Sequence, residues 1–98
     1  MADRTLKVGI IGIGWWALTR HVPRLRETGK AEVVAVARRN AAALADAQEA
    51  TGAAGAYTDW QRLLEHPGLD AVIVATPHHA HAAPTLAALA RGLHVLVE

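Results

Sequence analysis

The stretch Lys7-Val-Gly-Ile-Ile-Gly-Ile-Gly-Trp-Trp-Ala17 decides the fold class. Its first half, Lys7 to Gly12, is short, apolar and β-branched and ends in glycine, which predicts a buried strand. From Trp16 to Thr28, apolar side chains recur at helical spacing while arginines fall on the other side. The sequence therefore predicts a strand that turns directly into a helix.

Small residues in this turn suit the approach of a phosphate group. Gly12, Gly14 and Ala17 match G-x-G-x-x-[GA]. Gly12 permits a tight turn, Gly14 has no side chain where a diphosphate must approach the backbone, and Ala17 lets the helix pack closely. Free N–H groups and the helix dipole favour an anion there. We predict a dinucleotide site, against the alternative of a plain tight turn. The expected cofactor-binding residues of the turn are Gly12, Ile13, Gly14, Trp15 and Trp16.

Strand and helix patterns alternate along the rest of the chain. Five strands joined by four helices predict an α/β fold of the Rossmann type. Right-handed crossovers then give a doubly wound parallel sheet in the order 3-2-1-4-5, with the first two helices on one face and the last two on the other. No linker is found, so residues 1–98 are expected to form one domain. The remaining strands are predicted at Glu32–Ala37, Ala54–Tyr57, Asp70–Ala75 and Leu93–Val97, and the remaining helices at 40–52, 58–64 and 80–91.

Two of these helices carry capping residues at their predicted starts. Asn40 is expected to cap the alanine-rich helix that ends near Gly52. Thr58 and Gln61 fit a capping box at the start of the next helix. Trp60, just inside that helix, is expected to pack in the core.

Two arginines follow the second predicted strand. An acidic residue at this place would accept a hydrogen bond from the adenosine 2′-OH and select NAD. Arg38 and Arg39 stand there instead, guanidinium groups suit a 2′-phosphate, and Asn40 could assist. A well-formed charge-assisted hydrogen bond would favour NADP over NAD by about 10- to 150-fold. We therefore expect NADP, with NAD as the other candidate. A solvated arginine pair is the alternative interpretation.

The loop after the fourth strand is the other predicted contact with the cofactor. In the predicted order the fourth strand lies beside the first, so this loop borders the crevice in which ligands bind. Thr76, Pro77, His78 and His81 are expected to meet the nicotinamide half, and His79 to be partly exposed at a helix start. No carboxylate lies nearby and the histidine spacing fits no standard site, so no metal is predicted.

Composition argues against several classes of partner. A formal net charge of +1 gives no field suited to nucleic acid or to an anionic membrane. The absence of cysteine excludes disulfides and thiolate metal sites. The longest uncharged run, Ala71 to Ala90, contains histidines and prolines and would make a poor membrane helix. We expect a soluble, cytoplasmic protein.

Four blocks of the chain, in order and at sensible spacing, resemble the N-terminal domain of the Gfo/Idh/MocA (glucose–fructose oxidoreductase, inositol dehydrogenase, rhizopine catabolism) oxidoreductases. The resemblance implies that Glu98 belongs to the cofactor site and that a catalytic lysine would follow it. It also implies a C-terminal α/β domain, absent from this sequence, that supplies most substrate contacts and often the subunit interface. The chain departs from the commonest pattern at Arg38, where many members carry aspartate. The blocks are Val8–Ala17, Val34–Ala37, Asp70–Pro77 with His81, and Gly92–Glu98.

The resemblance implies reversible hydride transfer between a sugar, polyol or related carbonyl compound and the nicotinamide ring. The 98-residue chain alone is expected to bind NADP weakly and to turn over no substrate, so no catalytic residue is assigned. A non-enzymatic NAD(P) sensor of the same fold is the alternative. A site for S-adenosylmethionine is disfavoured because Arg38 replaces the ribose-binding carboxylate. Unpaired backbone at the Leu93–Val97 edge predicts a homo-oligomer, or further chain beside it.

Overall fold

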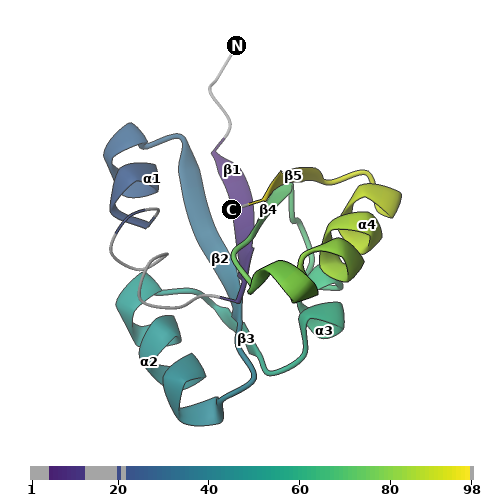
Figure 1. The fold of residues 1–98 in the computed structure, drawn as a ribbon. Helices are drawn as coiled ribbons and strands as arrows, with labels where there is room; N and C mark the ends of the chain where they lie inside the picture. The colour runs from purple at the N-terminus through teal and green to yellow at the C-terminus, as the bar shows by residue number, and fades with distance from the viewer. Residues whose placement is uncertain (1–4, 13–19, 21, 98) are drawn as a thin grey trace.

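The computed structural model describes residues 5–12, 20 and 22–97. Within these residues five parallel strands form one sheet in the order β3-β2-β1-β4-β5, as predicted (Figure 1). The central strand is β1 (Leu6–Ile11), because β2 pairs with one side of it and β4 with the other. The remaining strands are β2 (Ala31–Ala37), β3 (Gly55–Tyr57), β4 (Ala71–Val74) and β5 (His94–Val97).

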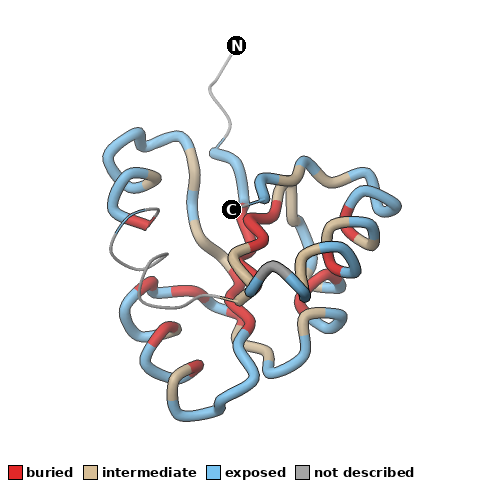
Figure 2. The backbone as a smooth tube through the Cα atoms, viewed as in Figure 1, coloured by how far each residue is buried: buried red, intermediate tan, exposed pale blue. Residues whose placement is uncertain are grey.

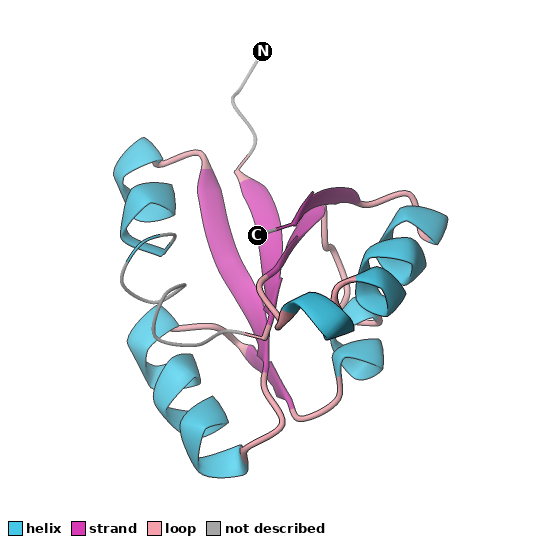
Figure 3. Ribbon diagram, viewed as in Figure 1, coloured by secondary structure: helices cyan, strands magenta, loops and turns pink. Residues whose placement is uncertain are grey.

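Helices cover both faces of this sheet (Figure 3). Helices α1 and α2 lie over β2 on one face, while α3 and α4 lie together on the other, which confirms the predicted layering. The first part of the helix predicted from Trp16, residues 16–19 and 21, lies outside the described residues. The described helices are α1 (Val22–Thr28), α2 (Ala41–Thr51), α3 (Trp60–Leu64) and α4 (Ala82–Ala90), and a 3₁₀ turn, η2 (His78–Ala80), precedes α4.

The alternation of strand side chains builds two cores, one on each face of the sheet. Figure 2 shows that the buried residues gather in the central strands and in the parts of the helices that cover them. Because successive residues point to opposite faces, Ile10 joins the core under α1 and α2, whereas Ile11 joins the core under α3 and α4. Buried strand residues are almost all apolar on both faces, as a parallel sheet covered by helices requires. The largest fully buried side chains are Ile10, Ile11, Leu63, Val36, Val72, Val74 and Pro84.

The predicted caps were right for α2 and wrong for α3. The Asn40 side chain accepts a hydrogen bond from the Ala43 N–H at 2.9 Å, and Gly52 ends the helix at φ +72°. At α3, however, the N-cap is Asp59 and not Thr58, because the Asp59 carboxylate accepts from the Gln61 N–H at 2.9 Å. A carboxylate accepts a hydrogen bond more strongly than a hydroxyl does, so the aspartate takes the cap and the helix begins one residue later.

The helix predicted from Ala80 to Arg91 begins later than expected. The structure separates the 3₁₀ turn η2 from α4, which starts at Ala82. Pro84 is then the third residue of the α-helix, where its missing N–H leaves no hydrogen bond unmade. The chain that leaves β4 stays next to the end of β1, because the Ala75 N–H donates to the Ile11 carbonyl oxygen at 2.9 Å.

The outer edge of β5 is apolar, as the sequence predicts. Leu96 is 54% exposed and Val97 is 44% exposed, whereas Val95 is half-buried against the core under α4. Among the described strands, β5 ends the sheet and so has a free side. Pairing of this edge with a second copy remains a prediction.

One side chain links the two helices on the first face. The Arg26 guanidinium on α1 donates to the carbonyl oxygens of Ala50 and Thr51 at the end of α2, each at 3.0 Å. We expect Arg26→Gln to lower the free energy of unfolding by about 1 kcal/mol, because these last-turn carbonyls lose a cationic donor. Urea unfolding measures the loss. Arg24→Gln, an exposed position on the same helix, is the matched control and should stay within about 0.5 kcal/mol of the parent.

Candidate functional site

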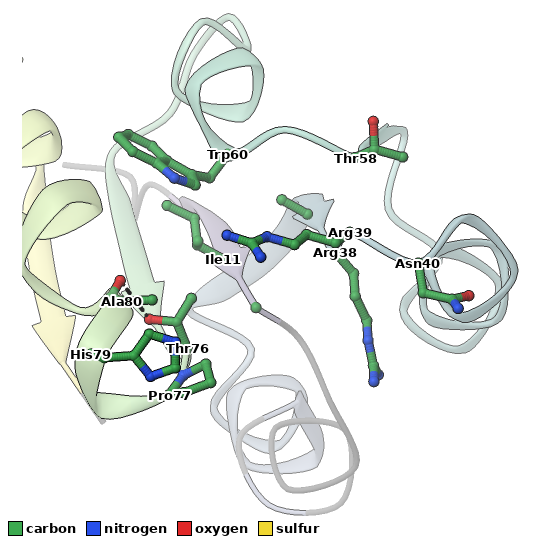
Figure 4. A pocket seen from close by; sticks show the side chains of 12 residues that line it. Ile11, Arg38, Arg39, Asn40, Thr58, Trp60, Thr76, Pro77, His79 and Ala80 are labelled. Carbon is green, nitrogen blue, oxygen red and sulfur yellow. Dashed lines mark hydrogen bonds between the residues drawn. The ribbon is translucent and has the colours of Figure 1, made fainter.

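A pocket of about 400 Å³ opens at the carboxyl ends of β1, β2 and β4 (Figure 4). This is the edge at which parallel α/β sheets bind their ligands, beside the strand where the chain order reverses. Its volume lies within the range of about 300–1,000 Å³ that small-molecule sites occupy. The lining residues are Ile11, Gly12, Ala37, Arg38, Arg39, Asn40, Thr58, Trp60, Thr76, Pro77, His79 and Ala80.

Gly12 lines the pocket at the end of β1, between the end of β2 and the loop that follows β4. Its N–H donates to the Ala37 carbonyl oxygen at 2.9 Å, which fixes the end of β1 to the end of β2. Its φ is +80°, a conformation that side chains rarely adopt. A Cβ atom here would lie 2.7 Å from the Thr76 Cγ2 atom and 3.0 Å from the Thr76 Cα and N atoms. Glycine is therefore required both by its backbone conformation and by the loop that follows β4.

The two arginines predicted from the sequence both line the pocket. The Arg38 N–H donates to the Tyr57 carbonyl oxygen at 3.0 Å, so the end of β2 is tied to the end of β3. Figure 4 shows the guanidinium groups of Arg38 and Arg39 leaving the strand end in different directions, one of them toward Trp60 and Ile11. None of the described residues that line the pocket is acidic. The electrostatic environment therefore favours an anionic group.

The turn after β4 is held together by its own hydrogen bonds. The Thr76 hydroxyl donates to the Ala80 carbonyl oxygen at 3.0 Å. The His81 ring is half-buried and is hydrogen-bonded through Nε2 to the Thr76 carbonyl oxygen. Thr76 and Pro77 lie in the pocket wall, and their contact with the nicotinamide half stays a prediction. His81 holds the turn and is not among the lining residues. A contact of His81 with nicotinamide stays a prediction, as does that of His78, which lies in η2.

Several lining residues were not predicted. The sequence predicts His79 only as a partly exposed residue at a helix start, Thr58 only as a helix cap, and Trp60 only in the core, yet all three line the pocket. Trp60 is half-buried, packs against the core under α3 and α4, and also lines the pocket, so the core interpretation was right but incomplete. Because β3 lies beside β2, the residues after β3 come to the same edge as Arg38, a consequence of the predicted strand order that could have identified them.

The remaining predicted cofactor contacts, Ile13, Gly14, Trp15, Trp16 and Glu98, lie outside the described residues. Across the part of the chain that is described, no group of three or more histidine, cysteine, aspartate or glutamate side chains is arranged to hold a metal ion. No helix in that same part is long and apolar enough to cross a membrane.

Known proteins match nearly the whole chain. A family model described as an oxidoreductase family with an NAD-binding Rossmann fold matches residues 6–98. The dTDP-3,4-didehydro-2,6-dideoxy-alpha-D-glucose 3-reductase of Saccharopolyspora spinosa is 37% identical over 95 residues, covering 97% of this chain and 28% of that protein. Inositol 2-dehydrogenase 4 of Saccharopolyspora erythraea is 35% identical over 106 residues, covering 100% of this chain and 29% of that protein. The chain thus spans less than a third of the length of these relatives.

Solved structures match in the same way. KijD10, a 3-ketoreductase from Actinomadura kijaniata in complex with TDP-benzene and NADP, superposes with a TM-score of 0.88 at 33% identity, over 96% of this chain and 29% of that one. The WlbA dehydrogenase from Bordetella pertussis, in complex with NADH and UDP-GlcNAcA, superposes with a TM-score of 0.87 at 28% identity, over 96% of this chain and 28% of that one. Proteins of this fold therefore hold either dinucleotide.

Proposed function

Since the chain belongs to the Gfo/Idh/MocA oxidoreductase family, whose NAD-binding Rossmann domain it matches over residues 6–98, we propose that its pocket binds NADP. The parent protein would transfer hydride between NADP(H) and a sugar, a polyol or a related carbonyl compound. One observation carries the choice of cofactor. Arg38 and Arg39 line the pocket at the end of β2, and none of its described lining residues is a carboxylate that could accept a ribose 2′-OH.

The described residues fit the two halves of such a ligand. The arginine pair would hold the 2′-phosphate, since guanidinium groups donate several hydrogen bonds to one phosphate. Gly12, pressed against Thr76, would let the diphosphate approach the backbone of the turn that begins there. Thr76 and Pro77, on the β4 side of the pocket, would face the nicotinamide half. The bound cofactor would supply or accept the hydride.

The substrate site is proposed to lie outside this chain. The relatives are more than three times as long, and the two solved relatives described above are in complex with UDP-GlcNAcA or TDP-benzene as well as with a dinucleotide. We infer that residues 1–98 form the cofactor domain and that a further domain supplies the substrate contacts and the groups that move the proton. Such a division would leave this chain with binding but no turnover.

Calorimetric titration of NADP, NAD and S-adenosylmethionine tests the proposal. We expect NADP to bind more tightly than NAD by about 10- to 150-fold and S-adenosylmethionine not to bind. Equal affinities for NADP and NAD would refute the assignment of NADP, and failure of both dinucleotides to bind would refute the function. With the parent protein, a panel of sugars and polyols then separates the enzyme from a sensor, because binding without oxidation of any member would favour the sensor.

A further inference from the structure

The wall of the pocket opposite β4 belongs to a short excursion of the chain. After Tyr57 the chain leaves β3, contributes Thr58 and Trp60 to the pocket and forms α3. At His66 it comes back beside β3, where the His66 ring contacts Tyr57. The two ends of this excursion are joined by side chains, because the Tyr57 hydroxyl and the His66 Nδ1 atom are hydrogen-bonded at 2.7 Å. Their rings also meet edge to face, with centroids 5.9 Å apart and planes at 77°.

The backbone connects this pair to the arginines of the pocket. The Tyr57 carbonyl oxygen accepts from the Arg38 N–H at 3.0 Å, so a shift of Tyr57 would move the backbone of Arg38 at the end of β2. At the other end, the His66 N–H donates to the carbonyl oxygen of Leu63, a side chain with 0% exposure. This bond holds His66 at the end of α3, whose Leu63 side chain lies in the core, and the bond between the two side chains links His66 to Tyr57.

Gly55 makes room for the two rings. A Cβ atom on Gly55 would lie 2.7 Å from the His66 Nδ1 atom and 2.8 Å from the Tyr57 Cε2 atom. Gly55 is not among the glycines with positive φ, so its backbone conformation does not call for glycine. The small residue is needed at this place because the rings of Tyr57 and His66 occupy the space above it.

We propose that the Tyr57–His66 pair positions the adenosine side of the pocket and so sets the affinity for the adenosine 2′-phosphate half of NADP. The inference rests on the proposed function. Neither residue lines the pocket, so both act through their neighbours. The Tyr57 carbonyl oxygen accepts from the Arg38 N–H, and Thr58 directly follows Tyr57 in the segment that carries Trp60, so Tyr57 orients the adenosine side of the pocket. The turn after β4, which is proposed to face the nicotinamide half, forms a different wall of the pocket.

Removal of the hydrogen bond tests this role. We expect Tyr57→Phe and His66→Leu each to weaken the binding of NADP and of adenosine 2′,5′-bisphosphate about three- to tenfold, the effect of one hydrogen bond. Binding of nicotinamide mononucleotide, followed by ligand-observed NMR, should stay unchanged. The double variant should bind no more weakly than either single variant, because the two substitutions remove the same interaction.

Two further variants separate positioning from general damage. His66→Asn places an amide close to the position of Nδ1 and should restore most of the affinity. His94→Leu removes an exposed histidine from β5, on the opposite edge of the sheet from β3, and should leave both ligands unaffected. Thermal unfolding of each variant establishes that the protein under titration is folded.

The outcomes distinguish the two proposals. If the unsubstituted chain binds neither NADP nor adenosine 2′,5′-bisphosphate, the proposed function fails and this inference fails with it. If the unsubstituted chain binds both ligands and the Tyr57→Phe variant binds them equally well, only the positioning role is overturned. An equal loss for the adenosine and nicotinamide fragments would also overturn it, because that result marks a purely structural pair.

Discussion

Replacing Gly12 by alanine is expected to lower the free energy of unfolding by about 2–5 kcal/mol and to remove NADP binding. Two costs add at this position. Its φ of +80° is strained for any residue with a side chain, and the new methyl group would lie 2.7 Å from Thr76 Cγ2 and 3.0 Å from Thr76 backbone atoms. The Thr76 side chain could rotate away from the new methyl group, but the Thr76 backbone cannot move without displacing the turn after β4. Both sides of the pocket would then shift.

Gly92→Ala is the matched control for this substitution. Gly92 has a φ of +77°, close to that of Gly12, yet a Cβ atom there would have no atom within 4 Å outside its chain neighbours. It should therefore cost only the backbone strain, about 1–2 kcal/mol, and leave NADP binding intact. Urea unfolding and calorimetry measure the two effects. Equal losses of stability in both variants would show that the contact with Thr76 contributes nothing.

The strand order could be predicted because the sequence and the fold agree at several levels. Apolar runs such as Asp70–Ala75 have the length and composition of buried parallel strands, and right-handed crossovers leave few ways to connect them. The first residue of a helix was harder to predict where two neighbouring residues could both serve as its N-cap. Thr58 and Asp59 are both capping types, and the structure shows that Asp59, the stronger acceptor, takes the cap.

The sequence could place residues at the pocket where they directly follow a strand, while their contact with a cofactor stays a prediction. Arg38 and Arg39 were found because a parallel strand delivers the residues after it to the binding edge. Thr58 and Trp60 were missed because they were interpreted only as a helix cap and as core, although the predicted order already places β3 beside β2. His79 was interpreted only as a partly exposed residue at a helix start. No sequence pattern could have linked Tyr57 to His66, since their contact depends on how far α3 carries the chain before it returns.

Arg38→Asp is expected to reverse the preference between the two dinucleotides. The substitution removes a donor to the 2′-phosphate and adds a charge that repels it, so NADP affinity should fall about 100-fold or more. The new carboxylate can accept a hydrogen bond from the 2′-OH of NAD, so NAD affinity should hold or rise several-fold. Calorimetry at constant ionic strength measures both, and their ratio is the readout because a general loss of stability would weaken both ligands together.

A control must change the net charge equally without entering the pocket. Arg62→Asp does so, since Arg62 is exposed on α3 and does not line the pocket. Its ratio of NADP to NAD affinity should stay within about twofold of the unsubstituted chain, because an exposed charge outside the pocket is screened by salt. If Arg38→Asp leaves the ratio equally unchanged, Arg38 does not contact the 2′-phosphate. Since the guanidinium groups of Arg38 and Arg39 point in different directions, Arg39→Asp would then show whether the second arginine holds it instead.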